Sequence, residues 1–350
     1  MREEYSRARK GFWMYILGME SSCDETSAAV VEMGDGVCAI RSNIVASQIE
    51  THRLYGGVVP EIASRAHIEA ISRITYQALE EAGITVADLG GVAVTAFPGL
   101  IGALLVGVNF AKSLAYSRRI PLVAVNHIHG HVAAAYLAHP ALKPPFLALV
   151  VSGGHTCFYR VDSYTDFVEI GGTRDDAAGE AFDKIGRVIG LPYPGGAALD
   201  KLAYEGNSKA IALPSPALGG DTLDLSFSGI KTATLNYLNS MAQKEQPVNA
   251  ADVAASYTAR IVEALTKKTE LALQQSGMKT LVLAGGVAAN SHLRAALEEL
   301  CHRMGVTLAM PTRALCGDNG AMIAAAGYFE ILRGNFANTH LNASANDDGT

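Results

Sequence analysis

The segment that decides the fold reads YILGMESSCDETSAAVV at residues 15–31. It begins with the apolar run Tyr15–Met19, continues with a polar stretch from Glu20 to Ser27, and ends with the apolar run Ala28–Val31. Two apolar runs of strand length that flank a short polar stretch are typical of a strand, a tight turn and a second strand. We therefore predict a hairpin near the start of the fold, with polar side chains gathered at its turn.

The same pattern returns in the middle of the chain and again near its end. The apolar run Phe146–Val151 is followed by the turn-like stretch 152–156 and by the strand-like run Cys157–Val161. A third apolar run, Thr280–Leu283, leads into the small-residue segment AGGVAAN at 284–290 and then into a helical pattern. We interpret these units as a weak internal repeat, in which three strands end at turns made of small or polar residues.

Helices are expected between these strands. The apolar residues Ile68, Ile71, Ile74 and Leu79 recur at helical spacing, and a longer pattern of the same kind runs over 253–273. Strands that alternate with such helices indicate a mixed α/β fold. The chain has 350 residues, and with about 150 residues per domain as a guide it is expected to form two lobes.

Composition narrows the class of protein. The formal net charge of −6 disfavours a nucleic-acid binder that works by bulk electrostatics, because phosphate neutralisation needs clustered Lys and Arg. A role on RNA would therefore need a local basic patch or partner proteins. Cysteines number 5, an odd count without a C-x-x-C pair, which favours free thiols in a reducing compartment and hence a cytoplasmic protein.

The two ends of the chain lie outside these patterns. Residues 1–13 are charged and lack the apolar core of a signal peptide, so we expect a disordered extension upstream of the fold. The polar tail at 337–350 is expected to fray. No apolar run approaches the roughly 18 residues that a membrane span requires, so no membrane association is predicted.

One histidine pair has the spacing of a metal site. His127 and His131 lie four residues apart, so on a helix they share one face and can bind the same ion. A zincin protease would need Glu directly after the first histidine, and Ile128 stands there instead. The pair still needs a third ligand, and without one ordinary core or surface histidines are the favoured explanation.

Asp318 is the candidate third ligand. It lies in the segment CGDNGAM at 316–322, where a carboxylate precedes a helix of small residues. Aspartate is also a favoured N-cap residue that contributes roughly 1 kcal/mol in that role. Position alone therefore favours the capping role, and nothing in the spacing places Asp318 near His131.

Two turns are able to admit an anionic ligand. At 152–156 the sequence SGGHT offers glycine amides and the hydroxyls of Ser152 and Thr156 to anionic oxygens, although an ordinary hairpin turn is the favoured explanation of a single Gly-Gly pair. The segment 284–290 can admit a nucleoside and leads to a helix N-terminus. It lacks the G-x-G-x-x-G of a dinucleotide-binding fold.

An acidic helix is predicted at 175–184, with Asp176, Glu180 and Asp183 on one face. A solvated face explains this pattern, and the wall of a ligand cleft is the alternative. The S-x-x-K sequence at 228–231 matches the nucleophile motif of penicillin-binding enzymes. Its companions S-D-N and K-T-G are absent, so we discount that motif.

Six motifs taken together indicate a family resemblance. They are ESSCDET at 20–26, THRLYGGVVPE at 51–61, NHIHGH at 126–131, VSGGHT at 151–156, DAAGEAFDK at 176–184 and GDNGAM at 317–322. In this order they resemble the tRNA adenosine threonylcarbamoyltransferase (TsaD) family, once described as O-sialoglycoprotein endopeptidases. The resemblance runs from about Met14 to Phe336 without a missing motif.

The resemblance implies an α/β fold of the ASKHA type, the duplicated two-lobe architecture of actin, sugar kinases and Hsp70, with a central ligand cleft. The expected N-terminal lobe spans residues 14–130, and the expected C-terminal lobe spans residues 131–336, with the last helix able to return to the first lobe. The repeated strand-turn-strand units agree with such a duplication.

The resemblance also implies the site residues. His127, His131 and Asp318 would hold one divalent metal ion per subunit, usually taken as iron (Fe2+), although imidazole and carboxylate ligands suit zinc (Zn2+) as well. The substrate contacts carried over from the family are Val150, Val151, Ser152, Gly153, Gly154, Asp183, Gly196, Asp200 and Asn290. Asp24 and Glu25 are our own candidates for the catalytic base, because the acceptor amine must lose a proton.

The implied reaction is an acyl transfer in tRNA modification. A threonylcarbamoyl group passes from threonylcarbamoyl-AMP to N6 of adenosine 37 in tRNAs that read codons beginning with A, and AMP is released. The family implies an inactive paralogue and a small ATPase as partner subunits. The alternatives are an ATP-dependent small-molecule phosphotransferase of the same fold, an inactive scaffold that holds nucleotide, and a metalloprotease, which is the weakest because the Glu is missing.

Overall fold

The computed structural model describes residues 13–34 and 37–346, and these divide into two compact units. Unit 1 comprises the chain up to Lys143 and from Pro311 onward, and unit 2 comprises Pro144–Met310. Residues 1–12 of the expected extension lie outside the described residues, and Trp13 already belongs to the first strand. In the described part of the chain no helix is both long and apolar enough to cross a membrane.

Unit 1 is built on a mixed sheet. Its described strands are β1 (Trp13–Glu20), β2 (Glu25–Gly34), β3 (Val37–Ser47), β4 (Leu89–Phe97) and β5 (Leu122–Asn126), in the order β3-β2-β1-β4-β5. Strand β2 is antiparallel to both β1 and β3, whereas β1, β4 and β5 run parallel. The pairing of β1 with β2 extends to Glu20 opposite Ser27, so the predicted hairpin is confirmed.

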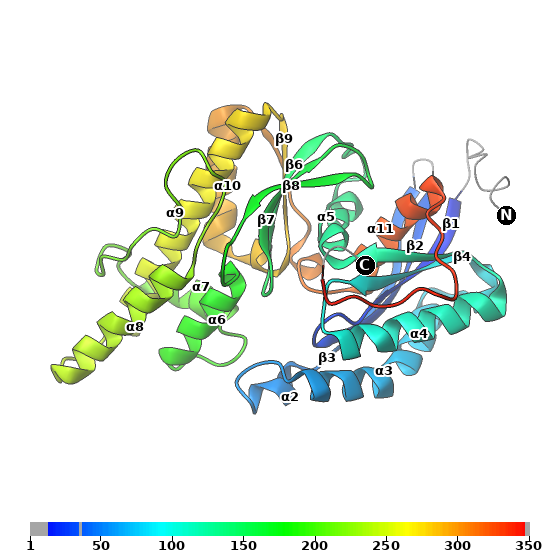
Figure 1. Cartoon of the computed structure of the whole chain (residues 1–350), viewed down its shortest axis with the longest axis horizontal. Coiled ribbons are helices and arrows are strands. Elements are labelled where there is room, and N and C mark those ends of the chain that lie inside the picture. The colour runs from blue at the N-terminus through cyan, green and yellow to red at the C-terminus, as the bar shows by residue number, and fades with distance from the viewer. Residues whose placement is uncertain (1–12, 35–36, 347–350) are drawn as a thin grey trace. The chain divides into compact units, whose positions relative to one another are not determined.

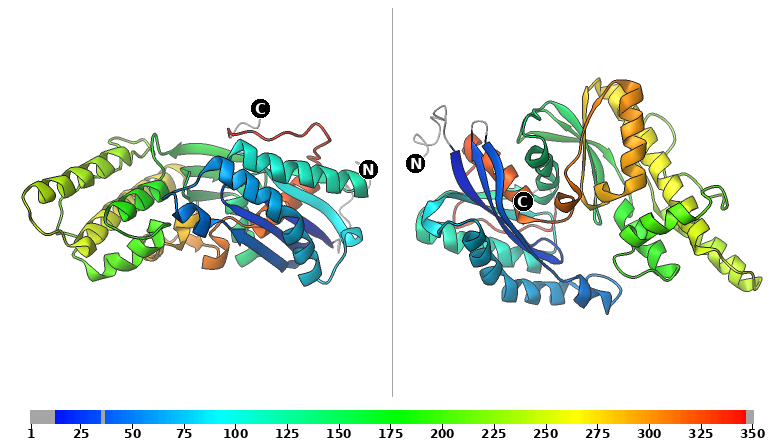
Figure 2. Two further views of the ribbon diagram at one scale, coloured as in Figure 1. Left: turned by 90° about the horizontal axis from the view of Figure 1, so that it is seen from below. Right: turned by 180° about the vertical axis from the view of Figure 1, so that it is seen from behind.

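Helices cover both faces of this sheet (Figure 1; Figure 2). Helices α3 (Pro60–Glu81) and α4 (Ile101–Arg118) pack on one face, where their apolar residues join the core formed by Leu17 and Met19 of β1. Helices α5 (His127–Ala138) and α11 (Gly320–Arg333) pack together on the other face. The short elements of the unit are α2 (Ile49–Arg53) and the 3-10 turns Val86–Asp88 and Arg313–Leu315.

Glycines let α11 lie directly on the β1–β2 hairpin. A side chain at Gly18 would place its Cβ 2.0 Å from the Gly320 carbonyl oxygen, and one at Gly320 would place its Cβ 2.7 Å from the Ala29 nitrogen. The Gly320 nitrogen also donates a 2.7 Å hydrogen bond to Ser27 Oγ. The N-terminus of α11, and the loop before it, are therefore fixed against the hairpin.

Unit 2 repeats the topology of unit 1. Its described strands are β6 (Phe146–Val151), β7 (Thr156–Val161), β8 (Phe167–Gly172), β9 (Thr280–Ala284) and β10 (Thr307–Ala309). Read as β8-β7-β6-β9-β10, the first three are antiparallel neighbours and β6, β9 and β10 run parallel, as in the sheet of unit 1. The predicted internal repeat is confirmed.

Along the chain, the helices of unit 2 follow β8 and β9. They are α6 (Ala178–Val188), α7 (Gly195–Leu202), α8 (Ser228–Gln243), α9 (Ala250–Ser276) and α10 (Ser291–Met304), with 3-10 turns at Ala203–Glu205 and Gly286–Ala289. The helix predicted over 253–273 is the core of α9, and the helical pattern after 290 is α10. Both predictions are confirmed.

The units divide after Lys143, whereas the sequence placed the division after Gly130. Helix α5 stays whole in unit 1 because it packs on α11. Gly130 permits this contact, since a Cβ there would lie 2.6 Å from Ile323 Cδ1. The expected boundary would have separated His127 from His131, and helix packing keeps them in one unit.

The tail was expected to fray, but its described part, which ends at Asn346, packs on unit 1. Leu341 and Ala343 pack against the core beneath α3 and α4. The Ser344 nitrogen donates a 2.9 Å hydrogen bond to the Ala96 carbonyl oxygen of β4. Apolar contacts and a backbone hydrogen bond therefore dock this otherwise polar segment on unit 1.

We expect Gly18→Ala to lower the free energy of unfolding by about 1–3 kcal/mol, because overpacking a rigid contact costs that much. Gly57→Ala is the matched control, since a Cβ at Gly57 would meet no described atom within 4 Å. Chemical denaturation of both variants measures the difference. Equal unfolding free energies for the two variants would contradict the close approach of α11.

Candidate functional site

Helix α5 carries the two histidines. It begins at His127 because the Asn126 side chain accepts hydrogen bonds from the backbone nitrogens of Ile128 (2.7 Å) and His129 (3.2 Å) and so caps the helix. His131 follows one turn later. The two imidazole rings lie 4.7 Å apart between centroids, at an interplanar angle of 75°. The prediction that the pair shares one helix face is confirmed.

Asp318 lies beside both histidines. Its Oδ1 is 3.3 Å from Nε2 of His131 and 3.6 Å from Nε2 of His127, and one ligand atom from each residue lies within 4.8 Å of the others. The capping role considered for Asp318 is wrong. The N-cap of α11 is the next residue, Asn319, whose side chain accepts a 3.0 Å hydrogen bond from the Met322 nitrogen.

The residues present fit a bound cation. His131 is 1% exposed, and neither of its ring nitrogens has a hydrogen-bond partner among the described residues. An unpaired buried polar group costs roughly 1–3 kcal/mol, and an ion at Nε2 would remove part of that cost. Two imidazoles and one carboxylate suit divalent transition metals, and three protein ligands leave open positions for a substrate oxygen.

Electrostatics in this centre also favour a cation. Burial lowers the pKa of His127, but the carboxylates of Asp318 and Glu20 outweigh burial and raise that pKa to about 9. A buried imidazole that is held in its charged form marks a site of strong negative potential. A divalent ion can take the place of the proton there.

The two candidate bases lie at the β1–β2 turn and at the start of β2. Asp24 is buried, and its carbonyl oxygen accepts a 3.1 Å hydrogen bond from the Gln48 nitrogen. Glu25 is partly buried and accepts a 3.3 Å hydrogen bond from Ser47 Oγ. Burial, the charge of Asp318 and the charge of Asp24 together raise the pKa of Glu25 to about 9. The charge of Asp318 therefore reaches Glu25, so Glu25 lies close to the candidate metal site.

The β1–β2 turn is held by residues to which the sequence assigned no role. His67 of α3 is fully buried, its Nδ1 accepting from Thr26 Oγ1 (2.7 Å) and its Nε2 donating to the Cys23 carbonyl oxygen (2.9 Å). Glu20 contacts the ring of His127. Both residues are fully buried, and buried polar groups need partners, but neither stands out from its polar sequence neighbours, so the sequence alone contains no signal for them.

In unit 2 the predicted substrate loop follows β6. The two valines that end the strand are buried, whereas Gly153 and Gly154 are exposed, and a Cβ on either would meet no described atom within 4 Å. The Ser152 nitrogen donates to the His155 carbonyl oxygen (2.7 Å), and Ser152 Oγ accepts from the His155 nitrogen (3.1 Å). The turn is closed at Ser152 and open at its glycines.

Asp183 and Gly196 meet where α6 and α7 approach each other. The Gly196 nitrogen donates a 2.9 Å hydrogen bond to Asp183 Oδ1. Next to it, a Cβ on Gly195 would lie 3.2 Å from the Cα of Gly186. Glycines thus bring the two helix backbones together, and this contact places the Asp183 carboxylate at the start of α7.

Asp200 fixes the start of α10. Its carboxylate accepts hydrogen bonds from the Ser291 nitrogen (3.1 Å), from Ser291 Oγ (2.9 Å) and from His292 Nδ1 (2.9 Å). Asn290 caps the same helix by accepting a 2.8 Å hydrogen bond from the Leu293 nitrogen. Asp200, predicted as a substrate contact, therefore also positions the loop that carries Asn290.

The acidic helix predicted at 175–184 begins later, at Ala178. Asp176 lies before it and forms ion pairs with Lys184 (3.3 Å) and Lys231. It therefore does not extend the acidic face of the helix, and that part of the prediction is wrong. The ion pair with Asp176 gives Lys231, the lysine of the discounted S-x-x-K motif, a structural role.

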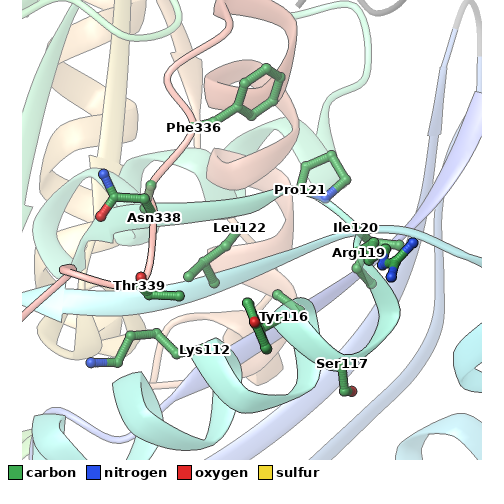
Figure 3. Close-up of a pocket in the computed structure, with 12 residues that line it drawn as sticks. Lys112, Tyr116, Ser117, Arg119, Ile120, Pro121, Leu122, Phe336, Asn338 and Thr339 are labelled. Atoms are coloured by element: carbon green, nitrogen blue, oxygen red, sulfur yellow. The ribbon is translucent and has the colours of Figure 1, made fainter. Parts of the chain in front are cut away.

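A pocket of about 600 Å³ lies elsewhere in unit 1 (Figure 3). It is formed by the C-terminal part of α4, the start of β5 and residues 336–339, with Tyr116, Arg119 and Phe336 among its lining residues. The residues that line it within the described chain do not include the candidate metal ligands. This pocket is therefore separate from the cluster formed by α5 and the loop before α11.

Glu25→Gln is expected to stabilise the metal-free protein increasingly as pH rises. Folding raises the pKa of Glu25 from an ordinary value of 4.5 to about 9. Between these values the folded state binds the proton more tightly than the unfolded state, so wild-type stability falls with rising pH. Glutamine has no proton to lose, and the Tm advantage of the variant should grow to several degrees across this window.

Thermal unfolding in the presence of a chelator measures this difference. Glu69→Gln, at an exposed position of α3, is the matched control and should follow the wild type at every pH. A Tm difference between Glu25→Gln and wild type that stays constant with pH would show that the pKa of Glu25 is not raised.

Solved structures with similar folds share the duplicated architecture. HypF from T. kodakarensis matches with a TM-score of 0.59 at 13% identity, over 92% of this chain and 48% of that chain. Component A of the Acidaminococcus fermentans (R)-2-hydroxyglutaryl-CoA dehydratase matches with a TM-score of 0.53 at 16% identity, over 91% and 99%. At such identities these likenesses concern the fold alone, and they confirm the expected ASKHA class.

Sequence comparison gives the family. The model of TsaD, tRNA N6-adenosine threonylcarbamoyltransferase, matches residues 39–325. The chain is 53% identical over 331 residues to the tRNA N6-adenosine threonylcarbamoyltransferase of Clostridium perfringens strain 13, covering 95% of this chain and 97% of that protein. It is 51% identical to the protein of that name from Clostridium beijerinckii, with the same coverage. This chain therefore belongs to the TsaD family of tRNA N6-adenosine threonylcarbamoyltransferases.

Proposed function

We propose that this chain transfers a threonylcarbamoyl group from threonylcarbamoyl-AMP to N6 of adenosine 37 in tRNAs that read codons beginning with A, releasing AMP. The observation that carries the proposal is the cluster of the buried His127 and His131 with the partly buried Asp318 in a chain of the TsaD family. Relatives at 51–53% identity bear the name of this activity. An ATP-dependent small-molecule phosphotransferase is not favoured, because it leaves these three residues without a role.

The proposed ion is Fe2+, with Zn2+ as the alternative, because two imidazoles and one carboxylate are a donor set found at non-haem iron sites and acceptable to zinc. When bound, the ion supplies Lewis-acid chemistry that polarises the carbamoyl carbonyl. The protein itself orients the side chains that would bind the ion. Helix α5 and the loop before α11 hold the three candidate ligand atoms within 4.8 Å of one another, which suits one ion per subunit.

The adenylate part of the donor is assigned to unit 2. The glycine amides of the turn after β6 and the hydroxyl of Ser152 are suited to donate to its anionic oxygens. Asp183 would accept from ribose hydroxyls, and Gly196, which lacks a side chain, would give the purine room. Asn290 would contact an amide or a base edge, while Asp200 keeps the start of α10 in place.

The reaction needs one proton acceptor. The N6 amine attacks the carbamoyl carbon, the bond from that carbon to the phosphate oxygen of AMP breaks, and the nitrogen loses a proton. Glu25 is the proposed acceptor and Asp24 is the alternative. A carboxylate whose pKa is raised toward the operating pH is a better base than an ordinary one, and the pKa of Glu25 is raised to about 9 by burial, Asp318 and Asp24.

Capture of tRNA is assigned to a complex rather than to this chain alone. With a formal net charge of −6, the chain offers little general attraction for phosphates. An inactive paralogue and a small ATPase are the proposed partner subunits. The cysteines of the chain, all of which lie in its described part, are free thiols, which supports a reducing, cytoplasmic setting.

Transfer of labelled threonylcarbamoyl from its adenylate to tRNA tests the function. With partner subunits present, His131→Ala is expected to lower the rate at least about 100-fold, because a lost ligand removes the polarising ion. His129→Ala, between the two ligands on the same helix, is the matched control and should keep the wild-type rate. Phosphate transfer from ATP to a small molecule, with tRNA left unlabelled, would support the phosphotransferase instead.

Glu25→Gln tests the proton acceptor. Single-turnover transfer should slow by about 100-fold or more, the usual contribution of a general base, and the rise of the wild-type rate with pH should disappear. In the metal-free protein the charge of Asp318 helps to raise the pKa of Glu25 to about 9. A bound cation offsets that charge and lowers the pKa of Glu25, so the rate of the metal-bound enzyme should rise at a pH below about 9. Full single-turnover transfer by Glu25→Gln would eliminate Glu25 and make Asp24→Asn the next variant.

A further inference from the structure

Glu20 is a buried carboxylate at the end of β1. It is 0% exposed. Its Oε1 accepts a 2.5 Å hydrogen bond from the Ser22 nitrogen, and its Oε2 accepts a 2.7 Å hydrogen bond from Thr95 Oγ1. The same Oε2 lies 2.9 Å from Nδ1 of His127. A fully buried carboxylate is costly unless its oxygens are satisfied, and here both oxygens have donors.

The fold brings these groups together. Strands β1, β4 and β5 are parallel neighbours, so their carboxyl ends lie along one edge of the sheet. Glu20 ends β1, Thr95 lies near the end of β4, and His127 directly follows β5. The contact between Glu20 and His127 is therefore built into the sheet rather than made by a mobile side chain.

The contact fixes which ring nitrogen of His127 carries the proton. An ionised carboxylate can only accept hydrogen bonds, so Nδ1 of His127 must be the donor to Glu20. In the neutral ring, Nε2 then keeps its lone pair, and Nε2 is the nitrogen that faces Asp318 at 3.6 Å. Ser22 Oγ lies 3.1 Å from the same Nδ1 and can accept from it as a second, weaker partner.

We propose that Glu20 is a positioning residue of the metal centre, which holds His127 in the tautomer and ring orientation that present Nε2 to the ion. This inference rests on the proposed metal site. The two histidines differ in this respect, because Nδ1 of His127 has Glu20 as its acceptor whereas Nδ1 of His131 has no comparable acceptor among the described residues. Carboxylates that support a metal-bound histidine in this way orient the ring and raise its basicity as a ligand.

A purely structural role for Glu20 is the alternative, in which the carboxylate only pins the turn through Ser22. The two roles predict different responses to substitution. Glutamine retains one acceptor oxygen and places two N–H donors on the other side. If the amide nitrogen faces His127, the ring must accept at Nδ1 and carry its proton on Nε2, which blocks metal binding. If the amide nitrogen faces Ser22, the Ser22 hydrogen bond is lost and the amide oxygen still accepts from Nδ1. The neutral amide lacks the charge that raises the basicity of the ring, however, so metal binding weakens in this arrangement too.

The test is a titration of the metal-free full-length chain with Co2+, read by the visible absorption of the bound ion. Glu20→Gln is expected to weaken Co2+ binding by about 10–100-fold, the usual effect of removing such an outer partner, and to change the Co2+ spectrum. Thr95→Val removes a hydrogen bond to the same carboxylate oxygen but leaves its contact with His127. Glu32→Gln removes another buried carboxylate of the same sheet, one that pairs with Arg41. Both controls should bind Co2+ as the wild type does.

Thermal unfolding of each variant in a chelator separates folding from metal binding. If Glu20 positions the ring, Glu20→Gln should lose more affinity for Co2+ than Glu32→Gln does, even when the two variants have the same thermal stability. Wild-type affinity and spectrum in a folded Glu20→Gln overturn the proposal. If Glu20→Gln does not fold, Glu20→Asp, which keeps the charge but shortens the reach, replaces it, and wild-type Co2+ binding by that variant overturns the proposal equally.

Two further variants distinguish this inference from the metal site on which it rests. His131→Ala and Asp318→Asn should abolish Co2+ binding if the site is correct. Loss of binding in those variants together with full binding in Glu20→Gln overturns the role of Glu20 alone. Absence of Co2+ binding by the wild type overturns the metal site and the inference together.

Discussion

The contact of α11 with the β1–β2 hairpin is the constraint on which the proposed metal site depends. Gly18 and Gly320 remove the side chains that would keep the helix away from the strand, and the Gly320 nitrogen is held by Ser27 Oγ. Because the helix begins at this contact, the residue two positions earlier, Asp318, has little freedom of position. Gly130 brings α5 against the same helix, so the histidines approach Asp318 through packing that exists before any ion binds.

The duplicated sheets use the same edge for different chemistry. In unit 1 the carboxyl ends of the parallel strands carry or precede Glu20, Thr95 and His127, which are side-chain donors and acceptors. In unit 2 the matching edge is made of backbone and glycine: Gly285 has φ +91°, and a Cβ there would lie 2.4 Å from the Val151 carbonyl oxygen. A metal ion needs side-chain ligands, whereas a nucleotide needs room and backbone N–H groups. One duplicated topology is therefore able to carry both of the proposed kinds of site.

Local patterns predicted the elements that depend on local sequence. The β1–β2 hairpin and the shared helix face of His127 and His131 follow from apolar periodicity and from spacing along the chain. The third ligand could not follow in this way, because the whole of unit 2 separates Asp318 from His131 in sequence, and only helix packing joins them. The family resemblance supplied Asp318, and residue spacing did not.

The errors of prediction have the same origin in tertiary contacts. The acidic helix begins at Ala178 rather than near 175 because the Ala178 nitrogen donates a 2.9 Å hydrogen bond to Oγ1 of Thr156. Thr156 belongs to β7, far from the helix in sequence. The tail docks through Leu341 and Ala343 although its composition is polar. In both cases a partner distant in sequence outweighs the local preference, and no window of neighbouring residues contains that partner.

Two glutamates of one hairpin have pKa values shifted in opposite directions, in keeping with the different roles proposed for them. Burial alone would raise the pKa of Glu20, but its contact with His127 and its donors outweigh burial and lower that pKa. Glu25 has Asp318 and Asp24 as neighbours and no comparable set of donors, so burial and like charge raise its pKa to about 9. Environments that shift the pKa values of two titratable groups in opposite directions indicate different roles for those groups. The lowered pKa suits Glu20 to orient a ligand, and the raised pKa suits Glu25 to its proposed role as proton acceptor. That raised pKa has a cost in stability, which a cation that binds only the folded state would offset.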